Sequence, residues 1–128
     1  WADFGLTEAY IRSHNSSTIA VESHVTWQRE VVEGAPFVIT AQILAFDDKR
    51  IQQFQRMYHA EEGFLAATCE WMNLHFDTSI RRVAPWPDEI RARIAEFADN
   101  QGSQPWPEQA GQRMQVKHPI FSGKPKAS

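Results

Sequence analysis

Histidines and carboxylates stand close together at several places in this 128-residue chain, where they could transfer protons or hold a metal. His24 lies between Glu22 and Glu30 in a strand-like stretch, where it could orient a substrate or act as a general acid or base. The alternative is a polar strand residue at a subunit interface. Eight residues of extended chain span about 26 Å, so Glu22 and Glu30 cannot form one catalytic pair.

Two further histidines have acidic neighbours at strand spacing. His59 precedes Glu61–Glu62, and His75 precedes Asp77. Residues two apart share a strand face, but two ligands do not complete a metal site, and we expect no metal. Cys69 has apolar strand neighbours, and because buried thiols in such surroundings are inert, we do not predict a nucleophile there.

Four predicted strands position these residues: 18–32, 37–46, 50–59 and 64–76. In the first strand Ile19, Val21, Val25 and Trp27 are expected on one face and His24 on the other. Turn residues follow each strand at short spacing, which predicts an antiparallel meander with hairpin loops.

Helical patterns flank the predicted sheet. Near the start, a helix's last turn is expected to stop at Gly5, a second short turn to follow over residues 8–11, and a polar loop over 13–17. After the sheet, residues 88–98 carry Ile90, Ile94 and Phe97 at helical spacing behind Pro87. We expect one domain over residues 1–98 and an extended tail over residues 99–128.

The bulk composition excludes several classes. A net charge of -3 and a pI of about 5.9 provide no broad cationic surface for nucleic acid. No apolar run approaches the ~20 residues of a membrane span. The single cysteine excludes an internal disulfide framework and favours a cytoplasmic setting.

The strand residues also occur in a recognisable order. The ordered segments are 22–30, Gly34, 43–50, 65–77 and 84–87. This order resembles hotdog-fold thioesterases of the 4-hydroxybenzoyl-CoA thioesterase type, nearest the branch of betainyl-CoA thioesterases, over roughly residues 1–95.

The resemblance implies an α+β hotdog fold, in which an antiparallel sheet wraps around a central helix. In that family an Asp-x-x-Gly-His-like segment precedes the helix. A carboxylate attacks the thioester or activates water, while N–H groups at the helix start hold the oxyanion. His14 is not preceded by Asp-x-x-Gly. We therefore expect the catalytic residue and most of the helix upstream of Trp1, in preference to a removed signal peptide.

The resemblance also implies which residues meet the substrate. Aromatic faces attract a betaine-like trimethylammonium group, and arginine forks match the phosphates of CoA. The predicted acyl-group contacts are His24, Trp27, Tyr58 and Trp71, and the predicted CoA contacts are Arg50, Arg56, Arg81 and Arg82. The alternatives are a core position for Trp27 and a solvated surface for the arginines.

The resemblance therefore implies an acyl-CoA thioesterase for a short-chain or betaine-like acyl group, with the CoA thioester as substrate and no cofactor. It also implies a homodimer or tetramer in which strand 18–32 pairs with its symmetry mate, so that the acyl pocket lies between subunits. One alternative is a non-catalytic hotdog module that binds CoA esters or a protein partner. The other is an interaction domain of another small α+β fold.

Overall fold

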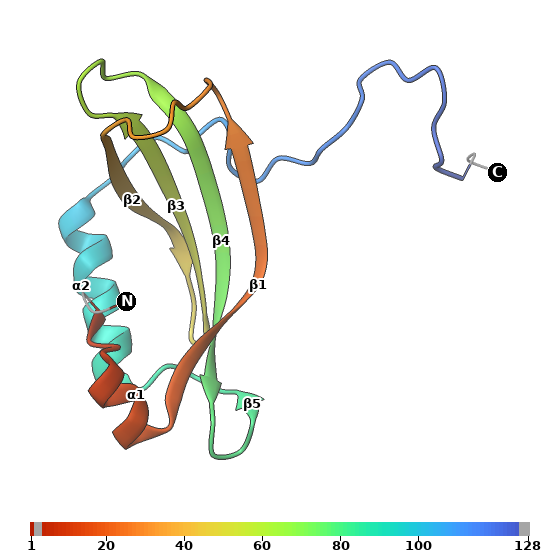
Figure 1. The fold of residues 1–128 in the computed structure, drawn as a ribbon. Coiled ribbons are helices and arrows are strands. Elements are labelled where there is room, and N and C mark those ends of the chain that lie inside the picture. The colour runs from red at the N-terminus through yellow and green to blue at the C-terminus, as the bar shows by residue number, and fades with distance from the viewer. Residues whose placement is uncertain (2–3, 126–128) are drawn as a thin grey trace.

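One antiparallel sheet forms the centre of the computed structural model, which describes residue 1 and residues 4–125 (Figure 1). Its long strands are β1 (Ser16–Trp27), β2 (Phe37–Phe46), β3 (Arg50–His59) and β4 (Leu65–Asp77). They lie in the order β1-β4-β3-β2, and the short strand β5 (Arg82–Val83) pairs with β4. The helices are α1 (Glu8–His14) and α2 (Asp88–Gln101), and neither is long and apolar enough to cross a membrane.

The connection between β1 and β2 crosses the end of the sheet (Figure 1). β1 pairs with β4, so residues 28–36 must pass β4 and β3 to reach β2. Three strand spacings amount to about 14 Å, which this stretch of chain can span. The predicted meander is therefore right for β2, β3 and β4 but wrong for β1. β4 pairs with β1 on one side and with β3 on the other, so it lies inside the sheet. Such a position suits a strand that carries apolar residues on both faces.

Because of a β-bulge at Val21, the predicted sheet face is wrong for Ile19 in β1. Ile19 pairs with Leu74 and Glu22 pairs with Met72, so one residue of β1 is left over between them. Because side chains alternate with a period of two, the extra residue places Ile19 on the same face as Glu22. The strand also ends earlier than predicted, at Trp27.

α1 shows why the predicted polar loop over 13–17 is wrong. Thr7 caps the helix, since its Oγ1 accepts a hydrogen bond from Tyr10 N at 3.2 Å. The helix includes residues 13 and 14, ends at Asn15 with φ 53°, and β1 begins at Ser16. The predicted short turn over residues 8–11 is confirmed as part of α1.

One face of the sheet, which we call the helical face, packs against α2 and the N-terminal segment. Its buried cluster joins two strand residues to residues of the flanking segments: Ile43, Ile51, Phe4, Leu6, Trp86, Ile90 and Ile94. The predicted spacing in α2 is thus confirmed, although the helix continues to Gln101. Elsewhere on this face Trp27 is 71% exposed and Ile39 is 63% exposed.

Residues 102–113, which we call the strap, cross the opposite face, the strap face. Gln42, Phe54 and Glu70 lie in one row across β2, β3 and β4. Gln42 Nε2 donates to Pro105 O at 3.4 Å, and Gly111 N donates to the Glu70 carboxylate at 3.0 Å. The strap contacts both ends of this row, so it runs over Phe54, which is 1% exposed.

Candidate functional site

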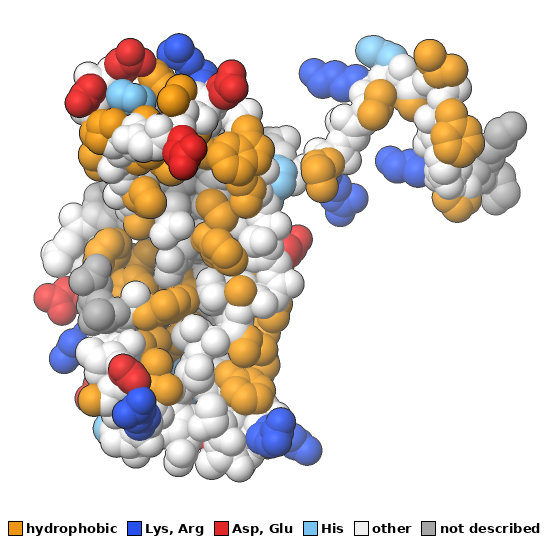
Figure 2. Space-filling model, in the orientation of Figure 1, with side chains coloured by type: hydrophobic (Ala, Val, Ile, Leu, Met, Phe, Trp, Pro, Cys, Tyr) orange, Lys and Arg blue, Asp and Glu red, His pale blue; other side chains and the backbone are white. Residues whose placement is uncertain are grey.

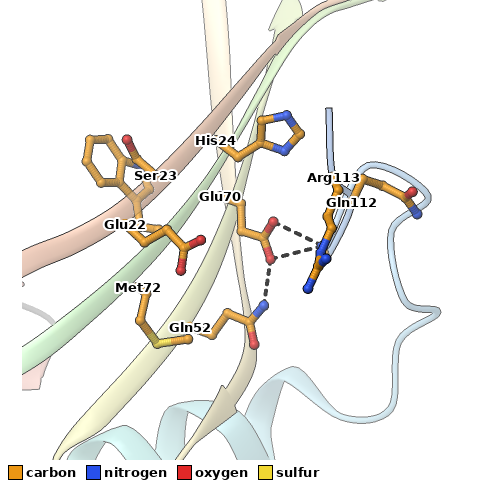
Figure 3. Close-up of a pocket in the computed structure, with 10 residues that line it drawn as sticks. Glu22, Ser23, His24, Gln52, Glu70, Met72, Gln112 and Arg113 are labelled. Carbon is orange, nitrogen blue, oxygen red and sulfur yellow. Dashed lines mark hydrogen bonds between the residues drawn. The ribbon is translucent and has the colours of Figure 1, made fainter. Parts of the chain in front are cut away.

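A cavity of about 220 Å³, the strap cavity, lies between the strap and the strap face of β1 and β4 (Figure 3). Glu22 pairs directly with Met72 and His24 pairs with Glu70, so these four side chains share one face. The full lining is Glu22, Ser23, His24, Gln52, Glu70, Trp71, Met72, Gly111, Gln112 and Arg113. The strand register therefore gathers two carboxylates, an imidazole and a thioether beneath the strap.

Glu70 anchors the strap at this cavity. Its two oxygens accept the Gly111 N–H at 3.0 and 3.2 Å, and Oε2 also accepts the Gln52 Nε2–H at 2.5 Å (Figure 3). Hydrogen bonds to an ionised carboxylate are among the stronger ones in proteins. The arrangement fixes the carboxylate and makes residues of the strap one wall of the cavity.

His24 and Glu22 are less engaged than Glu70. The Nδ1 atom of His24 is shielded from solvent and has no hydrogen-bond partner among the described residues. Figure 3 shows the His24 ring and the Glu22 carboxylate on the same side of the sheet as Glu70. Because Nδ1 has almost no accessible surface, a molecule in the cavity cannot contact it unless the ring moves.

The predicted acyl-group contacts divide between three places. His24 and Trp71 both line the strap cavity, although strand alternation directs the Trp71 side chain to the helical face. Trp27 instead borders an apolar hollow of about 190 Å³ on the helical face, beside residues such as Ile39. Tyr58 lies four residues along β3 from Phe54, about 13 Å from the Glu70 row. The structure does not gather the four into one pocket.

The predicted CoA contacts also separate. Arg50 forms an ion pair with Asp47 at 2.7 Å, and its strand partner Leu74 lies near the end of β4 that β5 joins. Arg81 and Arg82 are exposed at that same end. Arg56 instead donates to Gln42 Oε1 at 3.1 Å, and its guanidinium lies 4.8 Å from the centre of the Phe54 ring. Arg56 pairs with Thr68, six residues from Leu74, so it stands about 20 Å from Arg50 and still farther from Arg82, whose strand partner is Asp77.

Ser16 and His75 form a serine–histidine pair within the core. His75 Nδ1 faces the Ala84 carbonyl at 2.9 Å and must donate to it, so Nε2 accepts the Ser16 hydroxyl at 2.5 Å. Such pairs can activate a nucleophile. Ser16 is only 1% exposed and His75 4% exposed, so the pair is sealed from substrate and joins the start of β1 to the end of β4.

The other reactive groups that the sequence suggested are also accounted for. Burial raises the pKa of the Cys69 thiol, which keeps it protonated and poorly nucleophilic. His59 Nδ1 accepts the backbone N–H groups of Glu61 and Glu62 at 3.2 and 3.0 Å, and so caps the β3–β4 turn. Over residues 4–125 and residue 1, no three His, Cys, Asp or Glu side chains form a group that could hold a metal.

Comparison with known proteins assigns this arrangement to a family. The family model described as the thioesterase-like superfamily matches residues 1–94. The chain belongs to the thioesterase-like superfamily. A betainyl-CoA thioesterase from Pseudomonas aeruginosa is 31% identical over 110 residues, which cover 86% of this chain and 69% of that protein.

A longer relative and a solved structure extend the comparison. An L-carnitine dehydrogenase/betainyl-CoA thioesterase from Rhizobium meliloti is 32% identical over 113 residues; the match covers 88% of this thioesterase-like chain but only 23% of that protein. A hypothetical protein from Staphylococcus aureus, solved in complex with CoA, has a TM-score of 0.84 at 29% identity and covers 88% of this chain and 71% of its own.

A 1,4-dihydroxy-2-naphthoyl-CoA thioesterase from Synechocystis has a TM-score of 0.65 at 15% identity, covers 75% of this chain and 71% of its own, and supports the fold alone. The hotdog fold and the family that the strand residues resembled are confirmed.

Sequence reasoning missed several residues of this thioesterase-like domain's cavity. Glu70 is the one carboxylate between Leu65 and Phe76, and an acid within an otherwise apolar strand is a signal that could have revealed it. Gln52 and Arg113 gave no such signal, because they lie in a polar strand face and a polar tail. Their place became evident only from the strand register and the path of the strap.

Proposed function

We propose that this thioesterase-family protein hydrolyses the thioester bond of an acyl-CoA whose acyl group is short or betaine-like. The observation that carries the proposal is the 31% identity to the Pseudomonas aeruginosa betainyl-CoA thioesterase across 69% of that protein. The similar Staphylococcus aureus protein was solved with CoA, which supports a CoA thioester as the small-molecule substrate. The proposed reaction needs water and no further cofactor.

The chemistry of such a reaction assigns roles to particular surfaces. A carboxylate attacks the thioester carbonyl or activates water, N–H donors hold the oxyanion, and the CoA thiol departs. Glu70 already accepts hydrogen bonds from two donors, Gly111 N and Gln52 Nε2, so we assign it to anchoring the strap rather than to attack. Trp27 and its apolar hollow provide a surface for a trimethylammonium group. Arg50, Arg81 and Arg82 provide positive charge for CoA phosphates at one end of the sheet.

We also propose that the protein acts as a homodimer or tetramer in the cytoplasm. β1 is an outer strand of the sheet, and an outer strand offers unpaired backbone groups to a second copy. Several of its apolar side chains are exposed, among them Val21 and Val25. Cys69, the single cysteine, is a free thiol, which suits a reducing compartment.

Thiol release from a panel of acyl-CoAs tests the proposed activity. The full-length protein is mixed with acetyl-, butyryl-, benzoyl- and betainyl-CoA, and the free CoA thiol is followed with a disulfide dye. We expect release from the short and betainyl esters. If no ester releases thiol, hydrolysis is refuted, and calorimetric binding of an ester that stays intact would support the non-catalytic module instead.

The Trp27→Ala variant tests the acyl-group assignment. Loss of a cation–π partner is expected to raise KM for betainyl-CoA about threefold to tenfold, while KM for butyryl-CoA changes less. Trp106→Ala is the matched control, because Trp106 is a half-exposed tryptophan of the strap. Equal effects of both substitutions on betainyl-CoA would contradict the role of Trp27.

A further inference from the structure

Few contacts hold the strap against the sheet. Within the described part of the chain, two hydrogen bonds join them: Gln42 Nε2 donates to Pro105 O at 3.4 Å, and Gly111 N donates to the Glu70 carboxylate at 3.0 Å. The first distance exceeds the usual range of about 2.7–3.2 Å, so that hydrogen bond is weak. Because water competes for both partners, such bonds contribute modestly to stability. The strap can therefore separate from the sheet at a smaller cost than a strand can.

The middle of the strap is held together by its own contacts. Ala110 N donates to Pro107 O at 3.1 Å, and Trp106 Nε1 donates to Ala110 O at 3.4 Å. The rings of Pro105 and Pro107 fix two backbone φ angles. Pro107 and Ala110 are buried, whereas Trp106 is half-exposed. Residues 105–110 thus form a compact piece that can move as one body.

The strap begins at Gly102, whose backbone conformation other residues rarely adopt. Its φ is 72° and its ψ is -170°, a combination essentially restricted to glycine. A Cβ atom there would meet nothing within 4 Å, so the backbone rather than packing requires the glycine. Hinges are often residues at the end of an element that absorb changes in φ and ψ. Gly102 directly follows α2 and fits that description.

The other end of the strap is held by the hydrogen bond from Gly111 to Glu70. Gly111 also has a positive φ, 69°, in the conformation that directs its N–H to the carboxylate. Residues 114–125 follow without a helix or strand, and Figure 1 shows this tail leaving the sheet. Met114 and Val116, the first apolar residues of the tail, are both at least 75% exposed. The hydrogen bond to Glu70 is therefore the last contact that holds the strap down before the tail.

From this arrangement we propose that the strap is a lid, which swings about Gly102 and is held closed by the hydrogen bond from Gly111 to Glu70. Opening moves residues 105–110 away together and exposes the Phe54 ring to water. It also removes residues 111–113 from the wall of the strap cavity, so access to the cavity depends on the lid. The inference does not rest on the proposed thioester hydrolysis, because it concerns a movement of the chain alone.

The reactivity of a thiol placed under the lid tests the movement on the full-length protein. Ala110→Cys, made together with Cys69→Ser, is labelled with a disulfide dye, and Ser122→Cys in the exposed tail gives the rate of an accessible thiol. We expect Ala110→Cys to react at least tenfold more slowly. Its rate should depend on urea less steeply than global unfolding does, because opening the lid exposes little surface. Equal rates for the two thiols, or the urea dependence of global unfolding, overturn the lid.

Glycine substitutions show whether the closed strap controls that rate. Gly111→Ala places a side chain at a positive φ and strains the closed form, so labelling of Ala110→Cys should accelerate about tenfold. Gly63→Ala is the matched control, because Gly63 has φ 77° in the β3–β4 turn and equally open surroundings. It should change the rate less than twofold. Equal acceleration by both would mean that the dye reaches the thiol through global unfolding, which contradicts the lid.

Two further measurements test the hinge and the movement as one body. Gly102→Ala should also accelerate labelling, since the closed lid requires the glycine conformation; an unchanged rate contradicts a hinge there. In the unsubstituted protein, the amides of Ala110 and Gly111 should exchange through one opening, with a lower free energy than the amides of β3 and β4. Separate openings, or exchange by global unfolding alone, refute the lid even if a variant fails to fold.

Discussion

At the residue scale, His75 illustrates how a reactive pair can serve structure alone. Both ring nitrogens have a partner, the Ala84 carbonyl and the Ser16 hydroxyl, and the ring lies 5.3 Å from that of Trp86. Its interactions close the corner where β1 leaves α1 and β4 turns into β5. The buried hydroxyl and imidazole satisfy each other, so the loss of either leaves an unpaired polar group in the core.

Ser16→Ala tests that interpretation. The substitution leaves His75 Nε2 buried without a donor, and we expect the free energy of unfolding to fall by about 1–3 kcal/mol in urea titrations. Ser17→Ala, one position further along β1 and less buried, serves as the control and should change stability by less than about 0.5 kcal/mol. Equal losses in both variants would mean that the hydrogen bond to His75 contributes nothing specific.

At the scale of elements, the β2–β3 hairpin depends on one carboxylate. Asp47 Oδ1 accepts the N–H groups of Lys49 and Arg50 at 3.0 and 2.7 Å, and Oδ2 accepts Arg50 Nε at 2.8 Å. The hydrogen bond from the Arg50 side chain, together with the one from Lys49 N, lowers the pKa of Asp47 to about 2. The ionised carboxylate is therefore the form that closes the turn.

Asp47→Asn predicts a stability difference that depends on pH. The amide keeps an acceptor for the turn but loses the charge that pairs with Arg50. The folded pKa lies below the usual value, so the extra stability of the wild type is present above about pH 4 and disappears as the pH falls toward 2. The pair is solvent-exposed, and we expect only about 0.5 kcal/mol at pH 6.

Urea titrations of both proteins between pH 6 and pH 3 measure this difference, and carboxyl NMR shifts give the pKa of Asp47 itself. Asp99→Asn is the control, because Asp99 is an acid of α2 outside any hairpin. A wild-type advantage that stays constant over this pH range would contradict the role of the charge.

The elements also show how far the sequence could predict this molecule. Between turn residues, β2 follows from strand-forming composition, β3 from alternation, β4 from an apolar run and α2 from helical spacing, and the family followed from the order of the strand residues. The bulge at Val21 could not be predicted, because one inserted residue leaves the composition of the strand unchanged, yet it moves the side chains before it to the other face of the sheet. The pairing of β1 with β4 could not be predicted either, since alternation identifies a strand but not its neighbour in the sheet.

The candidate site was predicted only in part for a related reason. His24 was singled out from its own strand, and it does line the strap cavity. Its neighbour Glu70 belongs to a strand more than forty residues away along the chain, and Arg113 belongs to the strap. Contacts of that kind depend on register and on the path of an irregular segment, neither of which leaves a periodic pattern.

At the scale of the whole molecule, the sheet is covered differently on its two faces. Figure 2 shows apolar side chains spread over the sheet and along the C-terminal tail, whose Met114 and Phe121 are exposed. The strap, which closes the strap face, has few apolar side chains. Its attachment to the sheet therefore depends on hydrogen bonds at both ends of the Gln42–Phe54–Glu70 row, with Pro107 and Ala110 of the strap buried between them.

Glu70→Ala tests whether that attachment protects the core. The substitution removes the acceptor for Gly111 N–H and Gln52, so the strap should detach at one end and expose the Phe54 ring to water. Unfolding free energy is expected to fall by about 2–3 kcal/mol, since an anchoring charged hydrogen bond and part of an aromatic side chain's burial are lost. Hydrogen exchange at Gly111 and at residues 103–110 should accelerate in the native state.

Comparison with Glu70→Gln and Glu62→Ala makes that prediction specific. Gln keeps an acceptor oxygen for Gly111 but not the charge, so it should lie between the wild type and Ala in both stability and exchange rate. Glu62 lies in the exposed β3–β4 turn, and its removal should leave the strap unchanged. If Gly111 exchanges at the same rate in Glu70→Ala as in the wild type, the strap is held by its apolar residues alone. Glu70 would then not hold the outer wall of the strap cavity in place.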